Sequence, residues 1–142
     1  TVSLGANKAE DFEIPIKLAN SIDKLSELEL EVISKIDNEA EKRLNSTKCE
    51  QCRACIPCPS EVPIPEILRL RNISLGNGQV EFAKERYNLI GRAGHWWELK
   101  NGNDCNGCNV CISKCPHNLN IPNLLLETHN LLADKPKRRL WG

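Results

Sequence analysis

Apolar residues recur every four positions in one long stretch of the chain, as expected for one face of an α-helix. The members of this stripe are Leu28, Val32, Ile36, Ala40 and Leu44. Ser26 and Glu29 precede it with the spacing of a capping box. Acidic residues crowd its start and basic residues its end, which suits the helix dipole. The pattern predicts a helix over about 27–45, with an apolar stripe that packs on a core or on a further domain.

Three shorter helices are predicted after residue 60. Two of them start at an Ile-Pro pair, because proline suits the first turn of a helix. One begins at Pro65 and breaks at the glycines of 76–78, and the other covers about 122–133. A third, about 79–90, lies between them, and the glycine-rich stretch 91–104 is interpreted as a loop. Apart from a short apolar segment at residues 1–5, no strand pattern appears.

The two Ile-Pro helices belong to an internal repeat. Residues 58–68 match residues 115–125 in a shared frame of Cys-Pro, an aliphatic residue, Ile-Pro and an apolar pair. Each copy follows a run of cysteines. Two copies of one unit predict a pseudo-twofold arrangement, and the predicted fold class is all-α.

All eight cysteines lie in two short runs. The first run is Cys49, Cys52, Cys55 and Cys58, and the second is Cys105, Cys108, Cys111 and Cys115. A secreted disulfide scaffold usually spreads its cysteines so that bridges close useful loops. Cysteines at every third position instead predict metal centres in a reducing cytosol.

The second run has the spacing of bacterial ferredoxins, and the first is one residue shorter before its last cysteine. A [4Fe–4S] cube needs four thiolates, one for each iron. Three cysteines spaced three residues apart can surround one corner of the cube. The fourth, followed by proline, is better placed to bind the neighbouring cluster. The sequence therefore predicts two [4Fe–4S] clusters with crossed ligation and a function in electron transfer.

The crossed arrangement assigns each cluster three cysteines from one run and one from the other. The first cluster takes Cys49, Cys52, Cys55 and Cys115, and the second takes Cys105, Cys108, Cys111 and Cys58. Asn106, Gly107 and Asn109 allow tight turns whose N–H groups can bond cluster sulfurs. Arg53 is expected to add positive charge near the first cluster.

Several residues keep two interpretations. Structural zinc is the alternative for the cysteines, although zinc sites rarely show this spacing twice. The segment 95–97 (His-Trp-Trp) either shields a cluster or offers a surface to a redox partner, or it packs an ordinary loop. His117 either bonds a cluster sulfur or is simply exposed. The basic segment 135–139 is either a docking site for a ferredoxin or flavodoxin or a solvated tail.

Composition excludes some classes of function. The formal net charge is zero, which gives no support for a nucleic-acid partner. No apolar run is long enough to span a membrane. The N-terminus lacks the pattern of a signal peptide, and we expect a cytoplasmic protein. The sequence starts at Thr1 and contains no Met, which predicts an excerpt of a longer protein.

The segment 49–65, together with 105–116, resembles the C-terminal dicluster ferredoxin domain of one branch of the aldo/keto reductases. The Ile-Pro-Cys-Pro junction at 56–59 and the Ile-Pro helix start are its most telling parts. Residues 2–6 resemble the last barrel strand and its glycine turn in that family, and residues 25–29 resemble the start of a C-terminal helix.

The resemblance implies three segments. These are a remnant of a (β/α)8 barrel at 1–45, a helical dicluster domain at 46–134 and a basic tail at 135–142. The parent would be an oxidoreductase whose catalytic Asp, Tyr, Lys and His precede Thr1, so that this chain holds no catalytic site. NAD(P) or a flavin would bind only upstream. The implied partners are the upstream barrel and a ferredoxin or flavodoxin.

Two other functions stay open. One is an independent ferredoxin-like electron-transfer subunit of a multi-subunit reductase, which would not begin inside a strand. The other is a zinc-stabilised interaction module.

Overall fold

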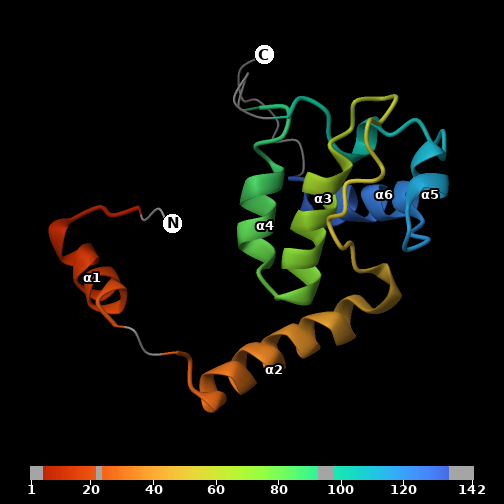
Figure 1. Ribbon diagram of the computed structural model, residues 1–142. Coiled ribbons are helices and arrows are strands. Elements are labelled where there is room, and N and C mark those ends of the chain that lie inside the picture. Colours follow the sequence, from red (N-terminus) through yellow and green to blue (C-terminus); the bar gives the residue numbers. More distant parts are fainter. Residues whose placement is uncertain (1–4, 22–23, 93–97, 135–142) are drawn as a thin grey trace, which may run out of the picture. The chain divides into compact units, whose positions relative to one another are not determined.

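The structure is a computed structural model that describes residues 5–21, 24–92 and 98–134 of the 142 in the chain. Every regular element in these ranges is helical (Figure 1). The predicted all-α class is therefore confirmed for the described residues. The strand predicted at 1–5 lies, except for Gly5, outside them. The chain divides into two compact units, Thr1–Ser34 and Lys35–Gly142, and each is described by itself.

The first unit holds a 3-10 turn (Ala9–Phe12), helix α1 (Glu13–Ala19) and the start of helix α2 (Glu27–Leu44). The predicted capping box opens α2. The Ser26 backbone N–H donates to Glu29 Oε2 at 2.7 Å, and the Glu29 N–H donates to Ser26 Oγ at 3.3 Å. The Ser26 backbone N–H, and to a smaller degree the Ser26 hydroxyl that donates to Glu29 Oε2 at 2.8 Å, lower the pKa of Glu29. The predicted helix at 27–45 is confirmed to within a residue.

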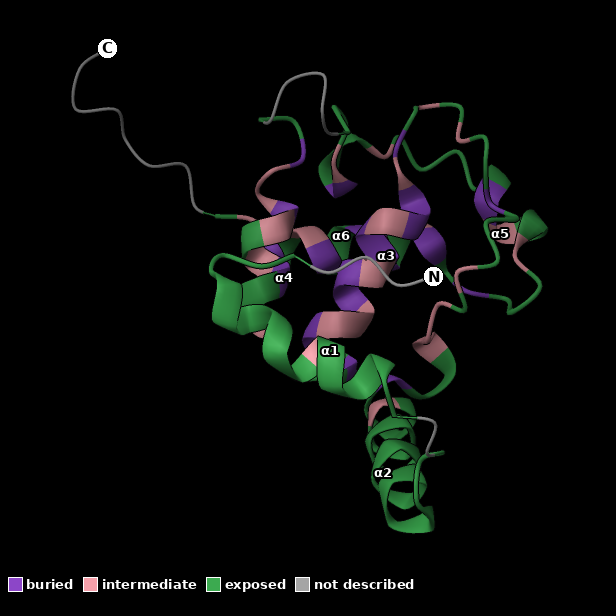
Figure 2. Cartoon of the chain, turned by 60° about the vertical axis from the view of Figure 1, so that its left-hand side comes forward, coloured by how far each residue is buried: buried purple, intermediate pink, exposed green. Residues whose placement is uncertain are grey.

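Helix α1 was not predicted, because Pro15 suggests a break in the chain. A proline in the first turn of a helix removes no intrahelical hydrogen bond, since the first N–H groups have no partner there. Pro15 is the third residue of α1. Almost all of α1 is exposed (Figure 2).

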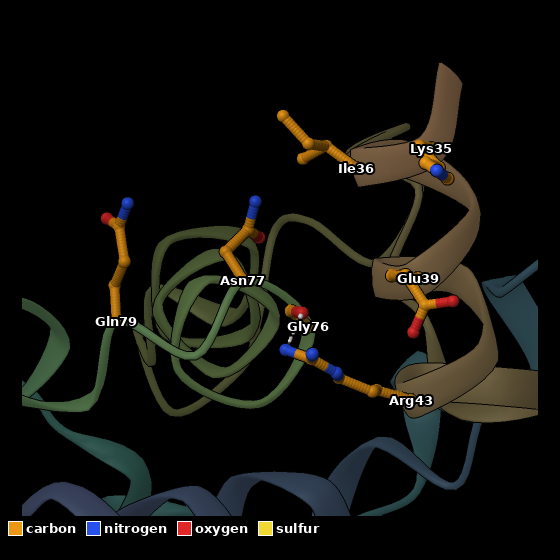
Figure 3. A pocket seen from close by; sticks show the side chains of 7 residues that line it. All are labelled: Lys35, Ile36, Glu39, Arg43, Gly76, Asn77 and Gln79. Carbon is orange, nitrogen blue, oxygen red and sulfur yellow. Dashed lines mark hydrogen bonds between the residues drawn. The ribbon is translucent and has the colours of Figure 1, made fainter. Parts of the chain in front are cut away.

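The apolar stripe of α2 is largely exposed, and Leu44 at its end is buried. Leu28 is 74% exposed and Ile36 is 55% exposed. Within the second unit, a Cβ at Gly76 would stand 2.8 Å from Leu44 Cδ1. Arg43 Nη1 donates to the Gly76 carbonyl at 3.2 Å (Figure 3). The end of α2 is therefore held against the turn at Gly76.

The second unit contains the repeat. Helix α3 (Ile64–Arg71) continues into a π-helical turn (Asn72–Gly76), and helix α4 (Val80–Tyr87) follows. A 3-10 turn (Gly102–Asp104), helix α5 (Val110–Lys114) and helix α6 (Ile121–Leu132) complete it. Helices α3 and α6 both start at the predicted Ile-Pro pairs. The short α5 and the π-helical turn were not predicted.

Helices α3, α4 and α6 pack on one another, with their buried sides turned inwards (Figures 1 and 2). The two copies of the repeat bury the same positions. Ile64 and Ile121 are each 1% exposed, and Leu68 and Leu125 are equally inaccessible. Because equivalent residues face one core, the loops in front of α3 and α6 are anchored to the same structure. In the described residues, no helix is long and apolar enough to cross a membrane.

Candidate metal centre

One pocket brings cysteines from both halves of the repeat together. Cys49, Cys52 and Cys55 come from the loop before α3, and Cys115 precedes α6; all four line the same pocket. The rest of its lining includes an apolar part, which consists of Pro65, Leu68, Leu119 and Ile121. An apolar surround of this kind limits the access of water and lowers the local dielectric constant.

The other four cysteines form a second group around Cys111. Burial is the main cause that raises the pKa of the Cys111 thiol, and the nearby thiols of Cys105, Cys58 and Cys108 raise it further. Cys58 belongs to the first run in sequence, yet its thiol raises the pKa of Cys111 in the second run. Each group therefore contains three cysteines of one run and the last cysteine of the other.

The two groups adjoin at their buried members. Burial raises the pKa of the Cys55 thiol to about 11, and Cys49 and Cys111 raise it as well. Cys55 and Cys111 are buried, whereas Cys52 and Cys108 are exposed. A metal binds the thiolate, so binding at Cys55 must release a proton that the free protein holds firmly.

The backbone of the two runs turns at the same places. Gln51 and Gly107 have φ angles of 57° and 70°, and Arg53 and Asn109 have φ angles of 62° and 61°. The turns predicted at Gly107 and Asn109 are confirmed. The side chain of Gln51 donates from Nε2 to Cys49 Sγ at 3.4 Å. Donors to sulfur of this kind tune iron–sulfur sites.

Two residues at the end of α3 hold the first cysteine run in place. Asn72 Nδ2 donates to the Cys49 carbonyl at 2.8 Å, and the Cys49 N–H donates to Asn72 Oδ1 at 3.4 Å. Arg71 donates to the carbonyl and the hydroxyl of Thr47, at 3.2 and 3.1 Å. Burial lowers the pKa of Arg71 and Glu127 counters this effect; the guanidinium stays charged at neutral pH.

Sequence reasoning missed Arg71 and Asn72, because nothing near them in the sequence marks them as neighbours of the cysteines. Asn72 starts the π-helical turn, and such turns are frequent at functional sites. The asparagine that begins the Asn-Ile-Ser-Leu-Gly turn was not a recognisable signal in one sequence. Only the fold brings this turn to the first run.

Arg53 and His117 also line the pocket of the first group. Arg53 pairs with Glu66 at 3.8 Å, and its side chain is 63% exposed, so solvent screens much of its charge. His117 is exposed. The segments 95–97 and 135–139, for which we gave two interpretations, lie outside the described residues.

The donor set fits an iron–sulfur cluster. In the described residues, no three His, Cys, Asp or Glu side chains gather closely enough to hold a single metal ion. The sulfurs around a cube each bind a different iron and therefore stand farther apart than the ligands of one ion. Four thiols per group, an apolar wall and a donor to Cys49 Sγ fit such a cluster.

A helical fold that gathers cysteines of two spaced runs around a buried pocket is typical of iron–sulfur proteins. More particularly, the family model of the 4Fe-4S dicluster domain matches residues 48–120, just over half of the chain. The chain belongs to this family and is an iron–sulfur electron-transfer module that binds [4Fe–4S] clusters. Comparisons with curated proteins and with solved structures found no match.

Proposed function

We propose that this chain transfers single electrons through two [4Fe–4S] clusters with crossed ligation. The ligands of the first cluster are Cys49, Cys52, Cys55 and Cys115, and those of the second are Cys105, Cys108, Cys111 and Cys58. The observation that supports the crossing is the position of Cys115, which lines one pocket with the three cysteines of the first run. The effect of Cys58 on the pKa of Cys111 supports the reciprocal assignment.

The residues around the cysteines suit electron transfer. A [4Fe–4S] cluster supplies a one-electron couple whose potential depends on its surroundings. Leu68, Leu119 and Ile121 exclude water from the first group, and Gln51 donates to Cys49 Sγ. The exposed Cys52 and Cys108 give each group a side that a partner can approach. The buried Cys55 and Cys111 lie near enough for Cys111 to raise the pKa of Cys55.

Pairs of cysteine substitutions test the crossing. If Cys49 and Cys115 serve one cluster, the double variant Cys49→Ser/Cys115→Ser loses about half of its iron and sulfide. The matched control, Cys49→Ser/Cys58→Ser, also removes two cysteines. Because these two would serve different clusters, the control loses nearly all of its iron and sulfide. The measurement is iron and acid-labile sulfide per chain in protein purified without oxygen.

The opposite pattern would show that each run binds its own cluster. Then Cys49→Ser/Cys58→Ser would keep half of the iron, and Cys49→Ser/Cys115→Ser would lose both clusters. A colourless wild-type protein that contains zinc and no sulfide would disprove the electron-transfer function altogether, because zinc has no redox chemistry.

We propose further that the module belongs to an oxidoreductase of the aldo/keto reductase family and works in the cytoplasm. The support is the resemblance of 49–65 and 105–116 to the C-terminal domain of that branch. An upstream barrel would then hold the catalytic residues and the NAD(P) or flavin, and a ferredoxin or flavodoxin would exchange electrons with this chain. The sequence encoded before Thr1 tests this: a barrel with catalytic Asp, Tyr, Lys and His is expected, and an unrelated domain would refute it.

A further inference from the structure

The two cysteine groups have the same backbone but different side chains around them. Gln51 and Gly107 occupy equivalent left-handed positions, as do Arg53 and Asn109. A left-handed position costs a residue with a side chain more than it costs glycine. The second run uses glycine at the first of these positions, whereas the first run keeps a glutamine. That glutamine donates to Cys49 Sγ at 3.4 Å, a bond that Gly107 has no side chain to make.

A buried charge separates the groups as well. Counted from the Ile-Pro start of each helix, Arg71 of α3 and Thr128 of α6 hold equivalent positions. Both are buried, at 6% and 0% exposure. Arg71 donates to Thr47, two residues before Cys49, while the hydroxyl of Thr128 donates to the Leu124 carbonyl within its own helix. The first group therefore has a fixed cation where the second has a neutral residue.

A gain in stability alone does not explain the burial of Arg71. Within the described part of the chain, its Nε has no hydrogen-bond partner, and its acidic neighbour Glu127 lies 3.9 Å away with a largely exposed side chain. A buried charge that is paired incompletely usually costs stability. Arg71 lies one helical turn after Leu68, which lines the pocket of the first group. That places Arg71 about 4.5 Å farther along the same face of α3.

We propose that Gln51 and Arg71 raise the reduction potential of the first group above that of the second, so that a single electron rests at the first group. Added negative charge is stabilised by a donor to sulfur and by a cation in a medium of low dielectric constant. Arg53 adds less, since its charge is exposed and paired with Glu66. One electron comes from an external one-electron donor, and no bond forms or breaks. This inference rests on the proposed two-cluster function.

A redox titration of the anaerobic, cluster-loaded chain, followed by electron paramagnetic resonance, tests the inference. Two one-electron steps are expected in the wild type. Gln51→Gly, which copies the second run, and Arg71→Met should each lower the upper step and leave the lower one in place. We expect a change of about tenfold in the equilibrium constant for reduction, which is about 59 mV for one electron.

Matched variants separate this effect from a loss of structure. Arg71→Lys keeps the charge and should restore the upper step. Arg69→Met removes a charge from the same helix, but Arg69 is only half-buried and is paired with Glu66 at 3.1 Å, so both steps should stay where they are. Gln51→Gly removes the side chain of a residue with a left-handed backbone conformation and should not impair folding. This variant therefore remains decisive if Arg71→Met fails to fold.

Two outcomes would overturn the inference alone. In one, the protein binds both clusters but Gln51→Gly leaves the upper step unchanged; in the other, Gln51→Gly and Arg69→Met shift both steps equally. A wild-type chain without iron and sulfide would instead refute the proposed function itself. The reverse substitution, Gly107→Gln, should raise the lower step, because it offers the second group the donor that it lacks.

Discussion

Gly102 shows how a single atom can determine the packing of the helical unit. A Cβ at this position would stand 2.6 Å from the Leu125 carbonyl oxygen and 3.0 Å from Tyr87 Oη. The Gly102 N–H donates to Tyr87 Oη at 3.0 Å, and that hydroxyl also bonds His129 Nδ1 at 2.8 Å. A glycine therefore lets the segment before the second cysteine run approach α4 and α6.

We expect Gly102→Ala to lower the free energy of unfolding by about 1–3 kcal/mol, since the added carbon must displace backbone of α6. Urea unfolding under anaerobic conditions measures the change. The control is Gly5→Ala, where nothing lies within 4 Å of the new carbon; its effect should stay within about 0.5 kcal/mol. Equal stability of the two variants would contradict the close approach.

At the scale of the element, the first turn of α2 depends on the charge of Glu29. Its pKa is lowered from an ordinary value of 4.5, first by the Ser26 backbone N–H and then by the Ser26 hydroxyl. For a carboxylate with a lowered folded pKa, the stabilisation is present above 4.5 and is lost as the pH falls through the folded value. The capping box should therefore open only in acid, below pH 4.5.

A nuclear magnetic resonance titration of the Glu29 carboxyl measures this. The midpoint should lie below 4.5 in the wild type and move up towards that value in Ser26→Ala. The same variant should weaken helical signals in the first turn of α2. An unchanged midpoint in Ser26→Ala would show that the hydroxyl does not contribute to the cap.

The sequence predicts an element well where one local rule determines it. Helix α2 has a capping box and a long apolar period, and α3 and α6 have Ile-Pro starts; all three were predicted. Helix α5 has only five residues, too few for any period to show. No signal in the sequence predicted the π-helical turn Asn72–Gly76. The sequence also did not predict that the apolar stripe of α2 is exposed, because an apolar period does not show which residues pack against it.

At the scale of the whole molecule, the sequence predicts a grouping of the cysteines but not the residues that surround them. Cysteine spacing and the repeat led to the groups that combine Cys115 with the first run and Cys58 with the second. The sequence did not predict the contacts of Gln51, Arg71 and Asn72. A buried arginine, for example, cannot be told from an exposed one in a sequence. Gln51 bonds its near neighbour Cys49, whereas Arg71 and Asn72 reach Thr47 and Cys49 only because α3 folds back on the first cysteine run.

Removal of the clusters should loosen the second unit and leave the first unchanged. All eight cysteines lie in the second unit, and metal binding contributes directly to the stability of a small fold. Amide hydrogen exchange before and after treatment with an iron chelator measures the effect. Protection in α3 and α6 should fall at least about tenfold, which is about 1.4 kcal/mol, while α1 exchanges as before. Unchanged protection in α3 and α6 would contradict the coupling.

The contact between the two cysteine groups has a consequence for the order of binding events. Cys111 raises the pKa of the buried Cys55 thiol, while Cys52 and Cys108 are exposed in different groups. A reductant bound near one exposed cysteine need not leave before an oxidant binds near the other. Turnover would then proceed through a ternary complex, and its steady-state kinetics would give intersecting rather than parallel double-reciprocal lines.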